Sequence, residues 1–113
     1  MGIIRRRDIA FRAKDWNGRD ILLLKSTLTQ HVARFHFDEL LVIDELRRRL
    51  PNPLVVIENP GAGSEQAIYD IPVGGHAYLL VAVKYRRWLG KGLIVTLYGT
   101  DQIPKGRQLW RRK

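Results

Sequence analysis

Four apolar stretches between residues 54 and 100 constrain the fold of this chain more than any other feature. Segments rich in glycine and proline, 60–64 and 74–75, separate the first three of them, and such residues favour turns. The stretches are LVVIEN (54–59), AIYDIPV (67–73), HAYLLVAVKY (76–85) and GLIVTLYGT (92–100). Short links join neighbouring antiparallel strands, so we expect a four-stranded antiparallel meander.

The last stretch alternates most clearly. Since side chains of a strand point to opposite faces in turn, Leu93, Val95 and Leu97 are expected on one face of the sheet. The opposite face is then expected to carry Ile94, Thr96 and Tyr98.

A hairpin signal lies near the start of the chain. Asn17-Gly18 stands between two runs containing apolar residues, 3–14 and 19–25, and both turn residues tolerate a positive φ. The pattern predicts an N-terminal β-hairpin with its turn at residues 15–18. Residues 5–7 are three arginines, for which a solvated basic arm and a phosphate contact are both open.

Residues 25–41 have the pattern of a helix. Ser26 or Thr27 is a suitable N-cap, and Thr27 with Gln30 forms a capping-box pattern. His31 and His36 would point about 140° apart on one straight helix. Either one of these histidines is structural or the helix breaks at 35–37, and we favour the break.

A second helix is expected from Asp38, an acceptable N-cap, to about Arg49. Leucines and an isoleucine at three-to-four spacing between residues 40 and 50 form its apolar stripe, and Pro51 ends it. The fold class predicted is therefore α+β, with an N-terminal β-hairpin and helices packed on a four-stranded antiparallel sheet.

The charge favours a polyanionic partner. The 113 residues contain 20 Lys+Arg against 11 Asp+Glu, a net charge of +9, and nucleic acid is the commonest ligand of such chains. Solubility alone or an acidic protein partner are the alternatives.

The length suits a single domain spanning residues 1–113. We expect a basic tail outside the core, from about residue 101 to residue 113. Its Trp110 either anchors the tail to the body of the protein or stacks on a base, and we prefer anchoring.

Several site classes find no support in the sequence. No apolar run approaches the roughly 18 residues of a membrane span, and there is no secretory signal. The absence of cysteine excludes disulfides and is consistent with a reducing compartment. His31 and His36 lack the spacing of a helical zinc pair, and His76 lies far along the chain, so neither a metal nor a cofactor is expected.

Cleavage of RNA without a metal fits the remaining polar residues best. It needs a base for the 2′-OH, cationic donors for the phosphorane and an acid for the leaving 5′-oxygen. Histidine suits proton transfer near neutral pH, which makes His31 the first candidate. Lys84, Arg86, Thr96 and Tyr98 are candidate donors from a sheet face beside the helix. Each of these residues also has an ordinary structural role open to it.

A family resemblance adds to this interpretation. The stretches ILLLKSTLTQHVARFHFDEL, PLVVIEN, AIYDI, HAYLLVAVKY and GLIVTLY resemble the Barnase–EndoU–colicin–RelE-like (BECR) nucleases, most closely their small phage and toxin branch. Its members carry a helical histidine, often within H-x-x-x-H-Pro, and a V-T-x-Y pattern that residues 95–98 match. Here the two histidines stand one residue further apart, Phe37 replaces the proline, and Leu28 and Thr29 stand where a tryptophan is frequent.

The resemblance implies a metal-independent ribonuclease of toxin type, held by an acidic antitoxin or immunity protein. It would act in the cytoplasm, or be delivered into target cells, with RNA as its substrate and no membrane partner. The predicted catalytic residues are His31, Thr96, Tyr98, Arg34, Lys84 and His36. The predicted RNA-binding residues are Arg86, Arg87, Lys91, Lys105, Arg107 and Arg111. The alternative is a non-catalytic RNA- or protein-binding module on the same fold, and convergence of His31, Thr96 and Tyr98 in one cleft distinguishes the two.

Overall fold

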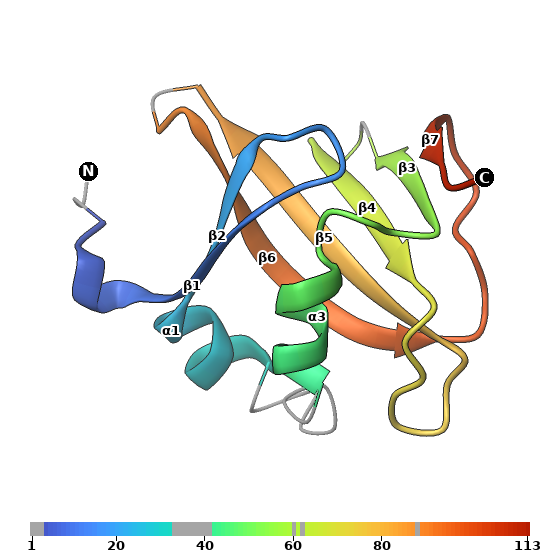
Figure 1. Cartoon of the computed structure of the whole chain (residues 1–113), viewed down its shortest axis with the longest axis horizontal. Coiled ribbons are helices and arrows are strands. Elements are labelled where there is room, and N and C mark those ends of the chain that lie inside the picture. The colour runs from blue at the N-terminus through green and yellow to red at the C-terminus, as the bar shows by residue number, and fades with distance from the viewer. Residues whose placement is uncertain (1–3, 33–41, 60, 62, 88) are drawn as a thin grey trace.

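The computed structural model describes residues 4–32, 42–59, 61, 63–87 and 89–113, with residues 31 and 32 described only in their backbone. These residues form one seven-stranded sheet in the order β1-β2-β6-β5-β4-β3-β7 (Figure 1). The strands are β1 (Ile9–Lys14), β2 (Asp20–Leu24), β3 (Val55–Asn59), β4 (Ser64–Tyr69), β5 (Tyr78–Arg86), β6 (Lys91–Thr100) and β7 (Gln108–Arg111). The helical elements are η1 (Arg6–Asp8), α1 (Lys25–Thr27), the π-helical turn η2 (Leu28–Val32) and α3 (Ile43–Arg49).

The predicted four-stranded sheet covered by helices was wrong, because the structure is mostly sheet. The antiparallel meander itself is confirmed, since β3, β4, β5 and β6 pair in sequence order. Two further pairings enlarge it. Strand β2 pairs in parallel with β6, and β7 pairs antiparallel with β3. Both pairings join segments that lie far apart in the chain, so no local sequence pattern predicts them.

The N-terminal hairpin is confirmed. β1 and β2 pair antiparallel up to Lys14 and Asp20, and Gly18 adopts a φ of +74° in the turn. The first strand begins later than expected, at Ile9, because residues 6–8 form the 3-10 turn η1. The Asp8 carboxylate fixes that turn by accepting the Arg5 backbone N–H at 2.9 Å.

The first helix differs from its predicted form. It begins directly after β2 with Leu24 at the N-cap, which makes no side-chain cap bond, so the predicted cap at Ser26 or Thr27 was wrong. The hydroxyl of Thr29 donates to the Lys25 carbonyl at 3.2 Å, a back-bond of the kind that disfavours a regular helix. The predicted break at 35–37 and helix start at Asp38 lie outside the described residues.

The second helix ends where the sequence predicts. Helix α3 runs to Arg49 with Leu50 as its C-cap, and Pro51 follows. Leu46 and Leu50 are completely buried, and they cover the same face of the sheet as the larger core (Figure 1). We call this the inner face. From the central strands it carries Leu79, Val81, Val83, Ile94 and Leu97.

The opposite, outer face carries a second, smaller core cluster of Val55, Ile57, Ile68, Leu80 and Ala82, joined by Tyr78, Val95 and Tyr98. A β-bulge interrupts β6, because Ala82 pairs with Thr96 while Val83 pairs with Ile94. Val95 is the extra residue. The predicted alternation was therefore wrong: Ile94 and Leu97 share the inner face, and Val95 joins Tyr98 on the outer face.

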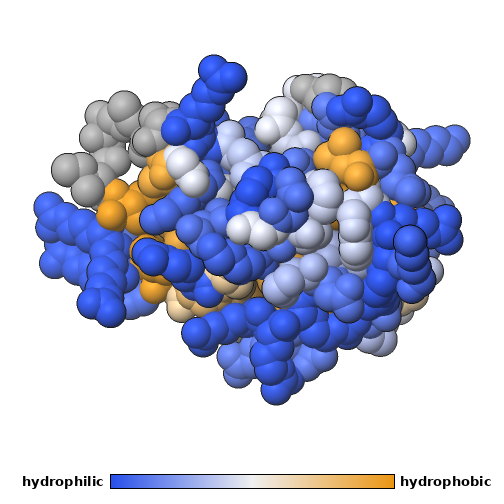
Figure 2. All heavy atoms as spheres, turned by 45° about the horizontal axis from the view of Figure 1, so that its top comes forward, coloured by the Kyte–Doolittle hydropathy of each residue, from blue (hydrophilic) through white to orange (hydrophobic). Residues whose placement is uncertain are grey.

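The C-terminal segment is part of the sheet. It was expected outside the core, but β7 pairs with β3 and Arg112 binds Asp70 through Nη2–Oδ2 at 2.8 Å. Trp110 packs against the main core, which confirms that it anchors the segment. No helix of the described part is long and apolar enough to cross a membrane. The face of the molecule seen in Figure 2 is predominantly hydrophilic, with small hydrophobic areas between the polar side chains.

Candidate functional site

The outer face of β5 and β6 gathers the sheet residues that the sequence singled out. Residues paired across two strands share a face. Lys84 pairs with Leu93, and Arg86 with Lys91, while Ala82 and Leu80 pair with Thr96 and Tyr98. Because Leu80, Ala82 and Tyr98 belong to the outer cluster, the whole row is on that face. We call Lys84, Arg86, Lys91, Thr96 and Tyr98 the outer-face row.

The row combines positive charge with hydroxyl groups. Within the described residues, Lys84, Arg86 and Lys91 form no ion pair with a carboxylate, so their charges remain available to an anion. Lys84 and Lys91 are half-buried, and Arg86 is exposed. Thr96 and Tyr98 are also half-buried, and each makes an interaction within the structure.

The helical segment that carries His31 contacts β6, and its Leu28 packs against the inner-face core. Strand β2 pairs with β6 at Gly92 and Leu93, and α1 and η2, which follow β2 in the chain, also contact β6. The backbone of His31 belongs to η2, which contacts β6. The side chain of His31 and the whole of Arg34 and His36 lie outside the described residues. The structure therefore places Lys84, Thr96 and Tyr98 on one face of the sheet, and the positions of the His31 and His36 side chains relative to that face stay untested.

The predicted RNA-binding residues divide into two groups. Arg86, Arg87 and Lys91 surround the β5–β6 turn, where with Arg19, Tyr85 and Gly90 they line a cavity of about 230 Å³. Lys105, Arg107 and Arg111 lie in and before β7, at the other edge of the sheet. Arg111 pairs with Val55 and so shares the outer face. The charge of Arg107 is compensated by Glu58, with which it forms an ion pair.

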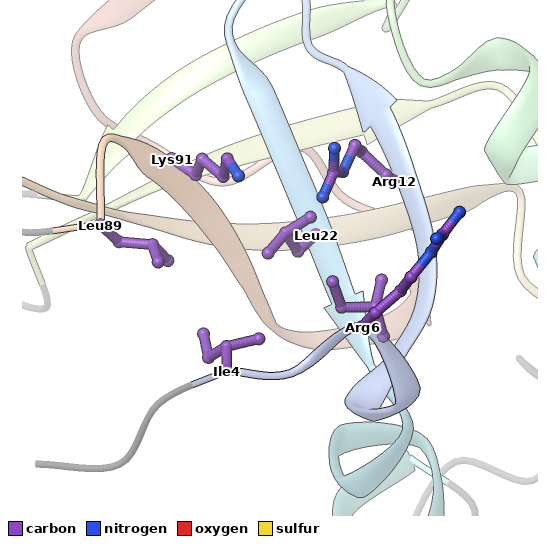
Figure 3. Close-up of a pocket in the computed structure, with 7 residues that line it drawn as sticks. Ile4, Arg6, Arg12, Leu22, Leu89 and Lys91 are labelled. Atoms are coloured by element: carbon purple, nitrogen blue, oxygen red, sulfur yellow. The ribbon is translucent and has the colours of Figure 1, made fainter.

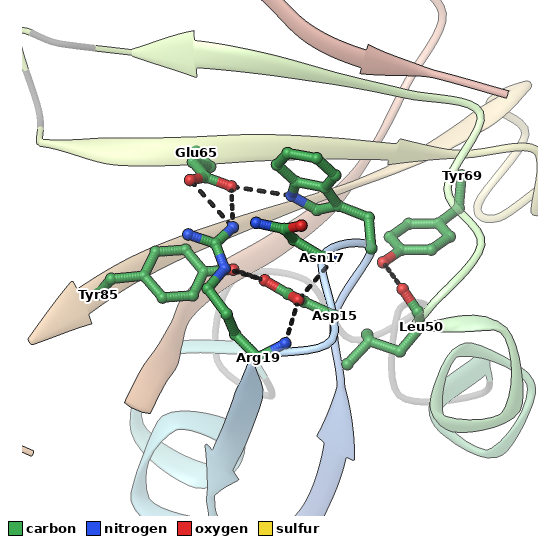
Figure 4. Close-up of polar contacts among 8 residues, drawn as sticks. Asp15, Asn17, Arg19, Leu50, Glu65, Tyr69 and Tyr85 are labelled. Carbon is green, nitrogen blue, oxygen red and sulfur yellow. Dashed lines mark hydrogen bonds and ion pairs between the residues drawn. The ribbon is translucent and has the colours of Figure 1, made fainter. Parts of the chain in front are cut away.

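A charged network that the sequence analysis missed lies under the hairpin turn (Figure 4). Asp15 is only 4% exposed and accepts hydrogen bonds from the backbone of Asn17 and Arg19, from Arg19 Nε at 2.8 Å and from the Tyr85 hydroxyl. Arg19 Nη2 binds Glu65 Oε1 at 2.9 Å, and its guanidinium lies 3.8 Å from the centre of the Tyr85 ring. The Asp-x-Asn-Gly-Arg turn was the available signal, but the partners on β4 and β5 are remote in sequence.

The network is structural in its chemistry. Burial, followed by the hydrogen bond to Asp15, raises the pKa of the Tyr85 hydroxyl, so it remains a neutral donor. Burial is the largest influence on the Arg19 pKa and lowers it, but the hydrogen bond to Glu65 and the electrostatic effects of Tyr85, Glu65 and Asp15 together outweigh it, so the pKa is raised. Because each charge has a bonded counter-charge, the network fixes the hairpin to the sheet and offers no unengaged acid or base.

The third histidine is held by a carboxylate. His76 Nδ1 lies 2.9 Å from Asp101 Oδ2, and Asp101 Oδ1 accepts the Ala77 backbone N–H at 3.0 Å. The bond to His76 lowers the pKa of Asp101. This pair joins the loop before β5 to the end of β6. Among the described residues, no three histidine, aspartate or glutamate side chains group in a way that holds a metal ion.

Comparison with known proteins adds no relative. No family model, curated protein or solved structure matches the chain. The resemblance to BECR nucleases thus stays a prediction, and the outer-face row is the arrangement on which a functional proposal has to stand.

Proposed function

We propose that this protein is a metal-independent endoribonuclease that binds single-stranded RNA on the outer face of its sheet. The observation that carries the proposal is the outer-face row, in which Lys84, Arg86 and Lys91 stand beside Thr96 and Tyr98. Segment η2, whose backbone includes His31, also contacts β6. A row of cations without carboxylate partners in the described structure suits a phosphate backbone.

The reaction proposed is an attack of the RNA 2′-oxygen on the adjacent phosphorus. A base removes the 2′-OH proton, the phosphorane forms, and the 5′-oxygen leaves with a proton from an acid, so the products are a 2′,3′-cyclic phosphate and a 5′-OH. His31 transfers the proton at one end of this reaction. Lys84 stabilises the charge of the phosphorane, and hydroxyl donors at Thr96 and Tyr98 orient its oxygens. Arg34 and His36 are the further candidates for charge stabilisation and proton transfer.

The remaining basic residues bind the flanking RNA in this proposal. Arg86, Arg87 and Lys91 contact phosphates at one end of the outer face, and Lys105 and Arg111 do so near the other edge. Since Arg107 is paired with Glu58, it contributes less to phosphate binding than its neighbours do. A cytoplasmic toxin of this kind would be neutralised by an acidic antitoxin or immunity protein that covers the same cations.

Incubation of the purified protein with total RNA in excess EDTA tests the proposal. Cleavage should persist without divalent metal and leave 2′,3′-cyclic phosphate ends, and Lys84→Gln should slow it about 10²-fold or more. Arg47→Gln is the matched control, because it removes an exposed cation of α3. This variant should cleave RNA like the parent. Cleavage that stops in EDTA and returns with one divalent ion contradicts the mechanism. RNA binding without any cleavage by the parent identifies the non-catalytic module instead.

A further inference from the structure

A cavity of about 640 Å³ lies where β1, β2 and the β5–β6 turn meet (Figure 3). It is lined by Ile4, Arg6, Ile9, Arg12, Leu22, Leu89 and Lys91. Arg12 pairs with Leu22, and Leu22 pairs with Leu93, the neighbour of Lys84 on the outer face. The cavity therefore opens on the same face as the outer-face row.

The cavity has an apolar floor and a cationic rim. Leu22 is only 1% exposed, so the accessible apolar surface of the floor comes from the half-buried Ile4, Ile9 and Leu89. Figure 3 shows the nitrogens of Arg12 and Lys91 pointing toward one another from opposite sides of Leu22, while the guanidinium of Arg6 points away. In the described structure neither Arg12 nor Lys91 forms an ion pair.

The neighbouring carboxylate of Asp20 does not cancel this charge. Asp20 follows the turn on β2, and the hydrogen bond from Lys14 is the largest cause that lowers its pKa. Arg12 and Lys91 lower that pKa further from a greater distance. Because Lys14 Nζ holds Asp20 Oδ1 at 2.6 Å, one cation already neutralises the carboxylate. Two positive charges are left over at the rim.

We propose that this cavity is a binding subsite for one nucleotide of a single-stranded RNA. The base would lie against the half-buried side chains of Ile4, Ile9 and Leu89, and the phosphate would lie between Arg12 and Lys91. A free inorganic anion would leave the apolar floor uncovered, and a purely apolar ligand would desolvate two unpaired cations. A nucleotide covers the apolar floor with its base and pairs the two cations of the rim with its phosphate. Aliphatic contacts do not distinguish base edges, so little base preference is expected.

The position of the cavity relative to the outer-face row supports this assignment. Lys91 begins β6 and Thr96 stands five residues further, roughly 16 Å at about 3.3 Å per residue. An RNA strand with its reacting phosphate near Thr96 would reach the cavity a few nucleotides away. The path of this strand rests on the proposed function, whereas occupation of the cavity by a nucleotide is testable by itself.

A titration of the ¹⁵N-labelled protein with uridine 5′-monophosphate, followed by NMR, tests the subsite. Saturable shifts are expected at the amides of Arg12, Leu22 and Lys91, with weaker shifts for inorganic phosphate and for uridine alone. The double variant Arg12→Gln/Lys91→Gln should abolish them, and Arg12→Lys/Lys91→Arg should retain them. The matched control Arg47→Gln/Arg48→Gln removes two exposed cations of α3 and should bind like the parent. Equal shifts in parent and Arg12→Gln/Lys91→Gln, or none with the nucleotide, overturn the inference.

A second measurement connects the cavity to RNA. Binding of a 2′-O-methyl oligonucleotide, which cannot undergo 2′-OH attack, should weaken about tenfold in Arg12→Gln/Lys91→Gln. The slope of log affinity against log salt should flatten by about 0.7, the value for one phosphate. An unchanged affinity and slope overturn the subsite even if the parent cleaves RNA. Nucleotide binding in a parent that does not cleave RNA contradicts the proposed function and leaves the subsite supported.

Discussion

Trp16 and Trp110 come from opposite edges of the seven-stranded sheet, yet their ring centroids are 6.2 Å apart with the planes tilted by 33°. Trp16 follows β1 in the hairpin turn, and Trp110 belongs to β7. Two edge elements can meet in this way only if the sheet curls strongly on its inner face. The Trp16 indole is held in place because its Nε1 donates to Glu65 Oε1 at 3.0 Å.

Replacement of Trp110 by alanine tests this closure. We expect Trp110→Ala to lower the free energy of unfolding by about 2–3 kcal/mol, less than for a fully buried tryptophan because Trp110 is half-buried. Urea denaturation measures the change. Ile103→Ala is the control, since Ile103 is 43% exposed and should change stability by less than about 0.5 kcal/mol. Equal stability of the two variants would show that the edge contact is not part of the stable fold.

The Asp15 network predicts a loss of stability at alkaline pH. The pKa of Tyr85 is raised by burial and by its bond to Asp15, and burial also raises the pKa of Tyr69. The folded state therefore keeps these phenol protons more firmly than the unfolded chain, whose tyrosines have a pKa of about 10. Their contribution to stability is complete below that pH and declines as the pH rises above it.

Tyr85→Phe separates the contribution of the Tyr85 hydrogen bond at neutral pH from the contribution of Tyr85 ionisation at alkaline pH. It should cost about 1–3 kcal/mol at neutral pH, because it removes a donor from the buried Asp15 carboxylate, and it should make the decline above about pH 10 less steep. Urea melts across that pH range give both quantities. Tyr69→Phe is the companion variant, since Tyr69 donates to the Leu50 carbonyl instead. A parent whose stability does not fall above pH 10 would contradict the shifts.

Gly92 is required where β2 and β6 approach each other. A Cβ at this position would lie 2.6 Å from Ile21 Cγ2, 2.7 Å from Tyr85 Cε1 and 2.9 Å from Val83 Cγ1. We expect Gly92→Ala to destabilise the protein by about 1–3 kcal/mol through overpacking. Gly61→Ala is the matched control, because the nearest atom would be Asn59 Oδ1 at 3.8 Å, an ordinary contact. Thermal melts of both variants measure the difference, and a Gly92→Ala protein as stable as Gly61→Ala would refute the close approach.

The proposed nuclease makes its most specific prediction at His31. Positioned acid–base groups contribute about 10²–10⁴-fold to rate, so His31→Ala should lose RNA cleavage by that factor. His36→Ala is expected to retain more activity. Single-turnover cleavage of total RNA, with a melting curve for each variant, makes the comparison. If His31→Ala cleaves like the parent while His36→Ala folds but is inactive, the proton transfer belongs to His36.

Features encoded by a few neighbouring residues were predictable from the sequence. Asn17-Gly18 predicts the hairpin because its glycine takes the positive φ that the turn needs, and Pro51 marks the end of α3. The meander follows from apolar runs separated by short links, as does the presence of Lys84, Thr96 and Tyr98 on β5 and β6. In each case the determining residues are adjacent in the chain.

Contacts between residues remote in sequence decided the strand pairing, the register of β6 and the partners of the hairpin turn. The parallel pairing of β2 with β6 and the addition of β7 turned a four-stranded sheet into a seven-stranded one, because hydrogen-bonding edges accept any strand that the fold brings to them. The bulge at Val95 changed which side chains share a face, since one extra residue reverses the alternation. Asp15 contacts Tyr85, and Arg19 contacts Glu65, only because the hairpin packs against β5 and β4. The sequence by itself determined the local elements, and their register and pairing depended on burying two cores at once.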